Sequence, residues 1–418
     1  MRAYGVYNAR PGLGLLRAGR AGVFLELNLR LVCRLTHFVP HSVPRLVFAV
    51  TTDLNYDQRM QRICASLARA GYAVLLVGWQ RPTSVPLGPQ PYAQHRLRGW
   101  FQHGKLFYLE YNLRLLLYLL GQRATAWACA DLDAALPTWL RARLGGQPFV
   151  YDAHELFTQV PEVVARPRVQ RLWQWVEDFI VPRARLRYTV GPALARLFEA
   201  RHPGCPFGVV RNVPAEGVGE MIDNQNDISN SQPPTLLYQG ALNVGRGLAE
   251  LLAAMPQVPA RLIICGEGDC SAALRQQAAG LGLLASGQVE FRGYVLPADL
   301  RVLTARATVG IMLLENTGLS YYYSLANKFF DYVQAGIPQL CIDFPEYRAL
   351  NAQYEVAELV PDLAPATLAA ALARLLPGGQ PGPRYHALAA NCCRARADWN
   401  WQREEQKLVE LYRCLLGR

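Results

Sequence analysis

Short apolar runs alternate with amphipathic segments along most of the chain. The runs at 45–54 and 72–79 predict two buried strands. Between them, the segment 57–71 predicts a helix that ends at a glycine, because its apolar residues recur at helical spacing: Met60, Ile63, Cys64 and Leu67. Continuous apolar strands joined by a helix indicate a parallel sheet that is covered on both faces.

The same alternation continues through the first half of the chain. A proline-rich loop is predicted at 81–94 and a helix at 105–120. Further strands are expected at 124–130, 148–153, 186–191 and 208–213. The stretch 214–234 then interrupts the pattern, because it is polar and ends in two prolines, and it predicts a linker between domains.

Alternation resumes after this linker, with strands expected at 235–240, 260–268, 289–294, 309–315, 338–342 and 357–360. We therefore predict an α/β protein with two doubly wound, Rossmann-like domains that face a cleft. The predicted divisions are an N-terminal extension (1–44), a first domain (45–213), a linker (214–234), a second domain (235–395) and a C-terminal helix (396–418). Ligands of such sheets bind at the carboxyl ends of the strands.

Composition narrows the class of partner. The 418 residues carry a formal charge of +11, which suits nucleic acid, anionic lipid or phosphorylated ligands. Nucleic acid is disfavoured, because the sequence has neither zinc-finger spacing nor a basic–aromatic run of the RNA-recognition type. The ten cysteines contain no Cys-x-x-Cys pair and fall mostly inside apolar runs, which indicates core thiols in a reducing compartment, hence the cytoplasm.

The N-terminal residues suggest contact with a membrane surface. No stretch of about 18 uncharged apolar residues predicts a membrane span. The apolar segment 23–35 fits an interfacial helix, an extension or a helix packed on the domain. Residues 1–45 hold seven arginines and one acid, Glu26. We therefore predict peripheral, salt-sensitive binding to the inner face of an anionic plasma membrane through residues 1–45 and an arginine-rich loop at 96–105; the alternative is a merely basic soluble enzyme.

Glycine-containing loops follow two strands of the second half. The stretch "YQGALNVGRGLAELL" combines a strand, a turn and a helix start, and its glycines allow a phosphate to approach the backbone near Arg246. The stretch "CGEGD" repeats this arrangement with Gly266 and Gly268 but lacks the third glycine of a dinucleotide fingerprint. These loops favour an anion site.

The stretch "NKFFDYVQAGIP" predicts a helix whose Lys328 and Asp331 lie three residues apart on one face. This pair is either a surface ion pair or a pair of groups that face a ligand.

Seven stretches together carry a family resemblance: "TTDLNYDQRMQRI", "VYDAHELF", "VVRNVP", "YQGALNVGRGL", "CGEGD", "FRGYV" and "NKFFDYVQAGIP". Over about residues 45–415 the chain resembles the family 4 glycosyltransferases, which are retaining enzymes of the GT-B fold, and it is most similar to a bacterial branch. The resemblance implies that the C-terminal helix returns to the N-terminal domain. The resemblance implies transfer of a hexose from a nucleotide-diphosphate sugar to an acceptor hydroxyl, in cell-envelope or exopolysaccharide synthesis. It implies a glycan or lipid-linked acceptor.

The resemblance also implies roles for the donor site. Arg246 and Lys328 would bind the diphosphate, and Asp331 would hold the ribose hydroxyls. Further donor-binding residues would be Gly240, Gly245, Gly266, Glu267, Tyr294, Tyr323, Ser324 and Asn327. The chain departs from the family's Glu-x7-Glu motif, because the second Glu is Asp331 and the first position is Tyr323; Tyr323 or Ser324 would take over the contact with the donor sugar.

In the first half, His154 follows a predicted buried strand, where it is either a structural histidine or, by the resemblance, a group that faces the donor sugar. Asp53, Asp57 and Arg59 follow the first strand, on the acceptor side, although Asp57 also fits a helix N-cap. The catalytic set we predict is His154, Arg246, Lys328 and Asp331.

Asp131 and Asp133 form an Asp-x-Asp pair. In a different glycosyltransferase fold, GT-A, a pair of this kind binds a divalent metal. Here they precede a predicted helix, so we interpret them as carboxylates at a helix N-terminus and predict neither a metal nor another cofactor. Two alternatives to a glycosyltransferase stay open: a GT-B-like sugar-nucleotide epimerase, and a non-catalytic nucleotide-sugar-binding protein.

Overall fold

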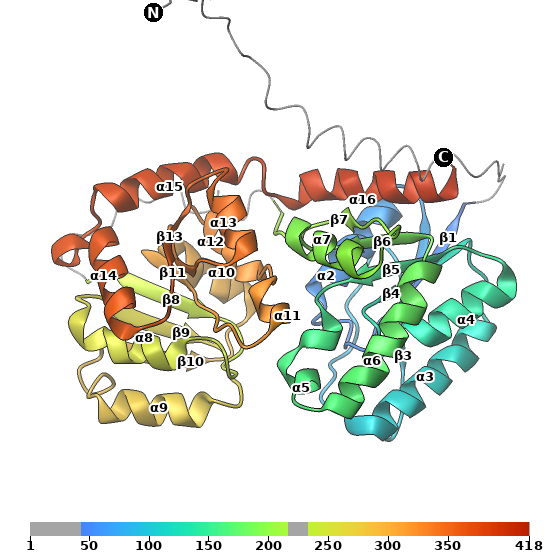
Figure 1. Ribbon diagram of the computed structural model, residues 1–418, viewed down its shortest axis with the longest axis horizontal. Helices are drawn as coiled ribbons and strands as arrows, with labels where there is room; N and C mark the ends of the chain where they lie inside the picture. Colours follow the sequence, from blue (N-terminus) through green and yellow to red (C-terminus); the bar gives the residue numbers. More distant parts are fainter. Residues whose placement is uncertain (1–42, 216–232, 418) are drawn as a thin grey trace, which may run out of the picture.

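Two parallel β-sheets lie side by side, each covered by helices (Figure 1). This computed structural model describes residues 43–215 and 233–417. The predicted extension at 1–44, with its apolar segment 23–35, and the predicted linker at 214–234 therefore fall almost wholly outside the described residues.

The first sheet has the strand order β3-β2-β1-β4-β5-β6-β7, and all its pairings are parallel. Its strands are β1 (Arg45–Ala49), β2 (Ala73–Trp79), β3 (Ala93–Leu97), β4 (Ala126–Ala130), β5 (Phe149–Ala153), β6 (Leu186–Thr189) and β7 (Gly208–Val209). The helices that cover it are α2 (Gln58–Arg69), α3 (Gly104–Leu120), α4 (Ala135–Gly145), α5 (Pro161–Val164), α6 (Pro167–Ile180) and α7 (Pro192–Arg201).

The second sheet has the order β10-β9-β8-β11-β12-β13, again all parallel. Its strands are β8 (Thr235–Gln239), β9 (Arg261–Cys265), β10 (Val289–Gly293), β11 (Val309–Met312), β12 (Gln339–Ile342) and β13 (Ala357–Val360). Its helices are α8 (Leu248–Ala254), α9 (Ser271–Gly280), α10 (Pro297–Arg306), α11 (Leu319–Tyr322), α12 (Asn327–Gln334), α13 (Pro345–Asn351), α14 (Pro365–Leu375) and α15 (Pro383–Ala395).

The apolar runs of the sequence become the central strands, which confirms the predicted fold class. In β1, for example, Leu46 to Ala49 are all buried, and the strand pairs with β2 and β4. The four apolar residues predicted on one face of α2 are buried as well. Because both faces of these strands are covered by helices, their residues need no alternation of polar and apolar side chains.

The strand β3 overlaps the ends of the loops predicted at 81–94 and 96–105, of which residues 81–92 and 98–103 are in neither helix nor strand. Its sequence, Ala-Gln-His-Arg-Leu, is mostly polar, and it pairs with β2 alone at the edge of the sheet. Within it, Arg96 is tied to the carboxylate of Asp53 at 3.1 Å. An edge strand is more exposed than a central strand, so it does not need the continuous apolar run by which buried strands are predicted from sequence.

The last helix, α16 (Trp401–Leu416), returns to the first domain and lies along its edge (Figure 1). The indole of Trp401 donates a hydrogen bond of 2.8 Å to the hydroxyl of Ser66 in α2. Further along α16, Tyr412 is fully buried and packs against Phe48 of β1. The chain therefore completes its first domain only with its final helix, as predicted for a GT-B fold.

Side chains of the second domain also bind the first domain directly. The buried carboxylate of Glu346, at the start of α13, accepts hydrogen bonds from the backbone N–H groups of Ala193 and Leu194 in α7. It caps a helix whose own N-cap residue, Gly191, has no side chain to do so. The amide of Asn212 donates to Asn327 at 2.7 Å. Among the described residues, no helix is long and apolar enough to cross a bilayer.

Candidate active site

A cavity of about 820 Å³ lies between the two domains. Its walls are loops that follow β1, β5 and β8, together with the first turns of α2 and α12. These are the carboxyl ends of parallel strands, where the sequence predicted the ligand. The predicted site residues that line it are Asp53, Asp57, Arg59, His154, Gly240, Arg246, Asn327, Lys328 and Asp331.

Lys328 brings a buried ammonium group to the cavity. It lies in the first turn of α12, is only 8% exposed, and its Nζ is 3.8 Å from the ring centroid of Tyr238. Burial, followed by the neighbouring charge of Arg246, lowers the pKa of Lys328 well below its usual value. No carboxylate within the described residues forms an ion pair with Lys328, so the ion pair with Asp331, one of the two alternatives that the sequence left open, is not formed.

Arg246 is the second cation of this wall. The glycines on either side of it adopt left-handed backbone conformations, with φ of 85° at Gly245 and 64° at Gly247. This turn aims the guanidinium over the ring of Tyr321, 5.0 Å from its centroid, and its buried Nε has no hydrogen-bond partner in the described chain. Within the described residues, neither Arg246 nor Lys328 forms an ion pair with a carboxylate, so a bound anion would satisfy their charges.

Asp331 lies on the same wall, one turn further along α12. Its Oδ2 accepts a hydrogen bond of 2.9 Å from the amide of Gln239, at the end of β8. Burial raises the pKa of Asp331 to about 6, and the positive charge of Arg62, which lies in the first domain, opposes that rise. A carboxylate held this way keeps acceptor capacity for hydroxyl donors of a ligand.

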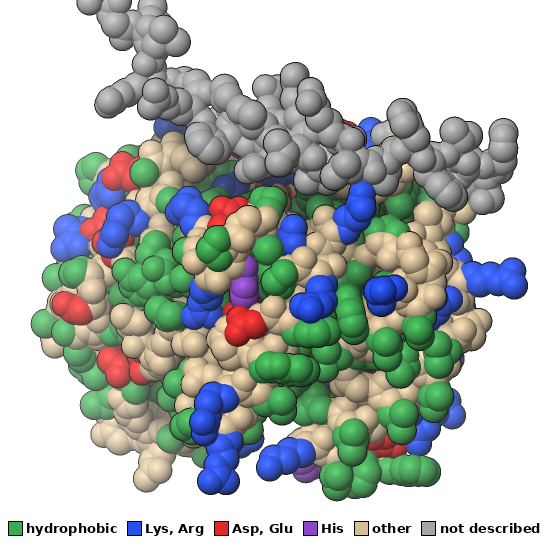
Figure 2. All heavy atoms as spheres, turned by 45° about the vertical axis from the view of Figure 1, so that its right-hand side comes forward, with side chains coloured by type: hydrophobic (Ala, Val, Ile, Leu, Met, Phe, Trp, Pro, Cys, Tyr) green, Lys and Arg blue, Asp and Glu red, His purple; other side chains and the backbone are tan. Residues whose placement is uncertain are grey.

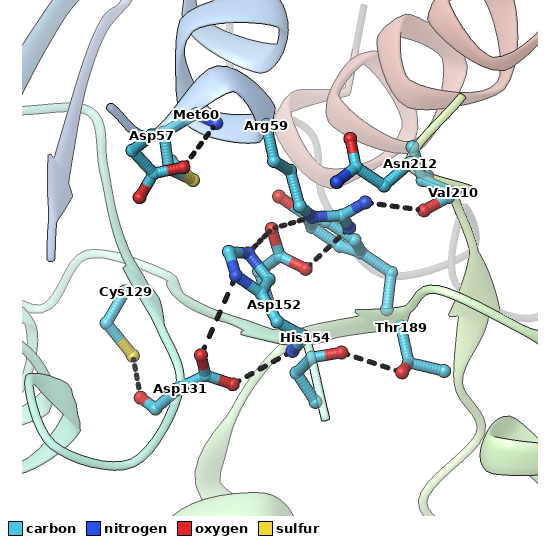
Figure 3. Close-up of polar contacts among 12 residues, drawn as sticks. Asp57, Arg59, Met60, Cys129, Asp131, Asp152, His154, Thr189, Val210 and Asn212 are labelled. Atoms are coloured by element: carbon cyan, nitrogen blue, oxygen red, sulfur yellow. Dashed lines mark hydrogen bonds and ion pairs between the residues drawn. The ribbon is translucent and has the colours of Figure 1, made fainter. Parts of the chain in front are cut away.

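On the opposite wall, His154 lies between two carboxylates (Figure 3). Its Nε2 is 3.0 Å from Oδ2 of Asp152, and its Nδ1 is 3.6 Å from Oδ2 of Asp131. Asp152 in turn binds the guanidinium of Arg59 at 2.8 Å, and Arg59 donates to the carbonyl of Val210. Asp131 also accepts from the backbone N–H of His154, at 2.9 Å.

This arrangement gives His154 a positive charge at neutral pH. Burial alone would lower the pKa of His154, but the carboxylates of Asp152 and Asp131 raise it to about 9. Burial likewise works against ionisation of Asp152, yet Arg59 and His154 hold its pKa below the usual range. Burial raises the pKa of Asp131 to about 7. His154 is therefore a third cation at the cavity.

The three predicted acceptor-side residues line the cavity but are engaged within the protein. The carboxylate of Asp57 accepts from the N–H of Met60 at 3.0 Å, so Asp57 is the N-cap of α2, the alternative that the sequence left open. Asp53 is buried and binds Arg96, and Arg59 is buried against Asp152. A role for them in acceptor binding stays a prediction.

The remaining donor-side residues do not all lie at the cavity. Gly266 packs on Gly240, where a Cβ would come within 1.9 Å of the Gly240 carbonyl oxygen, and Glu267 forms an ion pair with Arg275. Ser324 donates to the carbonyl of the neighbouring Tyr321, and the ring of Tyr323 packs edge-on against Tyr322. Tyr294 is 84% exposed and lines a separate depression with residues of α10.

Asp131 and Asp133 precede the helix α4, as predicted, but their carboxylates do not cap it. The N-cap of α4 is Ala134, and no side chain caps it. Asp131 instead binds His154, in a left-handed conformation (φ 57°) that no other non-glycine residue in 43–215 or 233–417 adopts. The carboxylate of Asp133 accepts from the hydroxyl of Thr51. Both groups therefore organise the loops after β1, β4 and β5.

Sequence reasoning missed four residues that shape the site: Tyr238, Gln239, Arg62 and Asp152. For Asp152 a signal existed, because a charged residue within the buried strand β5 needs a partner of opposite charge. No local signal identified the other three, since their roles arise from contacts with residues distant in sequence.

Comparison with known proteins supports a relation to glycosyltransferases. Residues 233–377 match the family model described as glycosyl transferases group 1. No curated protein matches the chain by sequence. The matched residues contain β8 to β13, hence the wall that carries Arg246, Lys328 and Asp331.

Solved structures match over nearly the whole fold. A sucrose-phosphate synthase from Thermosynechococcus elongatus is 18% identical, with a TM-score of 0.68, and the match covers 88% of this chain and 98% of that chain. HepE from Anabaena, in complex with UDP and glucose, is 14% identical, with a TM-score of 0.65 and the same shares. WaaG, a glycosyltransferase involved in lipopolysaccharide biosynthesis, is 16% identical, with a TM-score of 0.61, covering 87% and 98%. The fold is that of the GT-B glycosyltransferases.

Proposed function

We propose that this GT-B chain, which has a glycosyl transferases group 1 domain, transfers a hexose from a nucleotide-diphosphate sugar to an acceptor hydroxyl with retention. The observation that carries the proposal is the wall formed by Lys328, Arg246 and Asp331. It presents two cations that form no ion pair with a carboxylate of the described residues and, one helical turn away, a carboxylate that can accept from hydroxyl groups. A nucleoside diphosphate complements this wall, because its phosphates are negatively charged and its ribose hydroxyls can donate hydrogen bonds. HepE, of the same fold, is described with UDP and glucose.

In this mechanism Lys328 and Arg246 bind the diphosphate and stabilise the negative charge that grows on it as the glycosidic bond breaks. Asp331 accepts hydrogen bonds from the ribose hydroxyls. His154, with its proton held by Asp152 and Asp131, faces the donor sugar from the first domain. This reaction needs no nucleophile from the protein, because in a front-face mechanism the departing phosphate accepts the proton of the acceptor hydroxyl.

We also infer that the chain belongs to the bacterial branch of the family 4 enzymes and acts in cell-envelope or exopolysaccharide synthesis, at the cytoplasmic face of the membrane. The basic residues 1–45 and the description of WaaG as an enzyme of lipopolysaccharide biosynthesis support this. An acceptor carried on a lipid would be met at that surface.

Incubation of the purified full chain with a panel of UDP- and GDP-sugars tests the proposal. We expect one donor to raise the melting temperature, since a ligand that binds the native state stabilises it. The same donor should be consumed faster when an extract that contains acceptors is added. Binding without turnover would favour a non-catalytic nucleotide-sugar-binding protein. Conversion of the donor into an epimer would identify an epimerase, and no binding at all would contradict the proposal.

Replacing Asp331 by asparagine should weaken nucleotide binding by about 10–100-fold, because a charge-assisted hydrogen bond is worth about 1.5–3 kcal/mol. Calorimetric titration with the nucleoside diphosphate measures this. In the natural protein the affinity should also fall as the pH drops through about 6, where Asp331 gains a proton.

The matched control for this variant is Asp362→Asn, in the same domain, whose carboxylate accepts from the backbone N–H of Ala364 away from the cavity. It should bind nucleotide normally. If Asp331→Asn lowers the melting temperature and leaves the affinity unchanged, Asp331 has a structural role alone.

Transfer should survive EDTA, because Lys328 and Arg246 supply the positive charge that a metal supplies in GT-A enzymes. The rate with and without chelator, and after addition of Mn²⁺ or Mg²⁺, checks this. Loss of activity that a metal restores would assign Asp131 and Asp133 as ligands and contradict our assignment of the cavity.

A further inference from the structure

The outer face of α3 carries a stripe of exposed leucines. Its inner face is buried on the sheet through Phe107, Tyr111, Leu115 and Leu119. On the opposite side, five leucines at helical spacing are each 49–68% exposed: Leu106, Leu109, Leu113, Leu117 and Leu120. A helix that is apolar on both faces is normally covered on both, so this stripe calls for a partner outside the described domain.

Exposed apolar side chains also occur on α6, which touches α3 at one point. There the rings of Tyr108 in α3 and Trp173 in α6 lie 5.5 Å apart. On α6, Leu172 and Trp175 are more than half exposed. The indole of Trp100, just before α3, is 83% exposed and lies against the guanidinium of Arg114. Large apolar and aromatic side chains thus share one surface, which we call the α3–α6 face.

Cations border this face. Arg166, Arg168 and Arg171 are exposed at the start of α6, and Lys105 is exposed at the start of α3. Within the described part of the chain, none of these four side chains forms a hydrogen bond or an ion pair. The acid of α3, Glu110, has a mostly buried side chain that is already bound to Arg114 and to the backbone of Trp100. In the view of Figure 2, hydrophobic side chains gather on the lower part of the surface with Lys and Arg side chains around them.

We propose that the α3–α6 face docks on an anionic lipid bilayer, with the leucines and tryptophans at the level of the acyl chains and the four cations among the headgroups. Tryptophan favours this boundary, because its ring is apolar and its N–H is polar. The inference deepens the proposed function by naming the partner surface on which a lipid-carried acceptor would be met. It adds α3 and α6 to the contacts that the sequence predicted, which were residues 1–45 and the loop 96–105.

Charge distinguishes a lipid surface from two other possible occupants of this face, a second copy of the chain and residues 1–42. A second copy of the chain packed face to face would bring the arginine cluster of α6 against a region of its own sign. Residues 1–42 contain six arginines and one acid, so they too carry the same sign as the rim. An anionic bilayer has the opposite charge to the rim and therefore complements it.

Co-sedimentation of the full chain with vesicles, without donor, tests the proposal. We expect binding to phosphatidylcholine vesicles that contain phosphatidylglycerol and little binding to phosphatidylcholine alone. The triple variant Leu109→Gln, Leu113→Gln, Leu117→Gln should bind at least about tenfold more weakly. The variant Arg166→Gln, Arg168→Gln, Arg171→Gln should lose roughly fivefold for each arginine, or about a hundredfold.

Matched controls are Leu281→Gln with Leu284→Gln, and Arg143→Gln with Arg306→Gln, which alter exposed residues of the same types elsewhere. These controls should bind vesicles normally. All variants should keep their affinity for the nucleotide, so failure of the membrane proposal can be distinguished from failure of the proposed function. No binding at low salt, or equal binding by all variants, would overturn the inference. A change of molecular mass in light scattering, with unchanged vesicle binding, would assign the face to a second copy and also overturn it.

Discussion

Lys328→Met is expected to lower turnover by about a hundredfold or more while the protein remains at least as stable. Loss of one charge-stabilising donor in an active site typically costs a factor of this size. Stability should not suffer, because burial holds the pKa of Lys328 well below that of an unfolded lysine. The protonated form therefore costs free energy in the unliganded fold at neutral pH, and methionine keeps the apolar stem while removing the charge. Arg246→Met should lower turnover to a similar extent.

The measurement is kcat with saturating donor, together with thermal unfolding of the unliganded protein. Arg292→Met is the control, because Arg292 is an exposed cation of the same domain that is paired with Glu290. It should keep near-normal turnover. Near-normal rates in folded Lys328→Met and Arg246→Met would show that the diphosphate does not bind at this wall.

Asp152→Asn is expected to destabilise the first domain by about 3–5 kcal/mol, since removal of one partner leaves a buried charge without compensation. Asp152 and Arg59 are both almost fully buried. The same substitution removes one of the two carboxylates that raise the pKa of His154 to about 9. Attraction between His154 and Asp152 stabilises the fold fully below the unfolded pKa, near 6.5, and is lost as the pH rises through about 9.

Urea unfolding of both proteins at several pH values measures this effect. The stability difference between the natural protein and Asp152→Asn should shrink as the pH rises from about 6.5 to 9. Asp343→Asn, which breaks an exposed pair with Arg348, should cost about 0–1 kcal/mol. A difference that does not depend on pH would mean that His154 is not held as a cation by Asp152.

The central strands and the place of the site could be predicted because they depend on local patterns. Apolar runs identify strands that are covered on both faces, and glycines at the strand ends mark the loops that line the cavity. The edge strand β3 was not predicted, because its partly exposed residues are mostly polar. Asp131 was misassigned because its proximity to a helix start was visible in the sequence, whereas its contact with His154 across 23 positions was not.

The spacing of Lys328 and Asp331 shows the same limit. Three residues along a helix bring two side chains to one face, which is compatible with an ion pair. The structure separates them, because Lys328 lies over the ring of Tyr238 and Asp331 accepts from Gln239. Helical spacing fixes a shared direction, and tertiary neighbours decide the partner.

The return of α16 to the first domain has a consequence for engineering. The core beside β1 and β6 contains Tyr412, and the hydroxyl of Ser66 is bound by Trp401, so the first sheet is incomplete without the end of the chain. A chimera that joins the second domain of one such protein to the first domain of another cannot use a single crossover between the domains. It must take its final helix from the parent that supplied its first domain, so an exchange of the second domain requires two junctions, the second between α15 and Trp401.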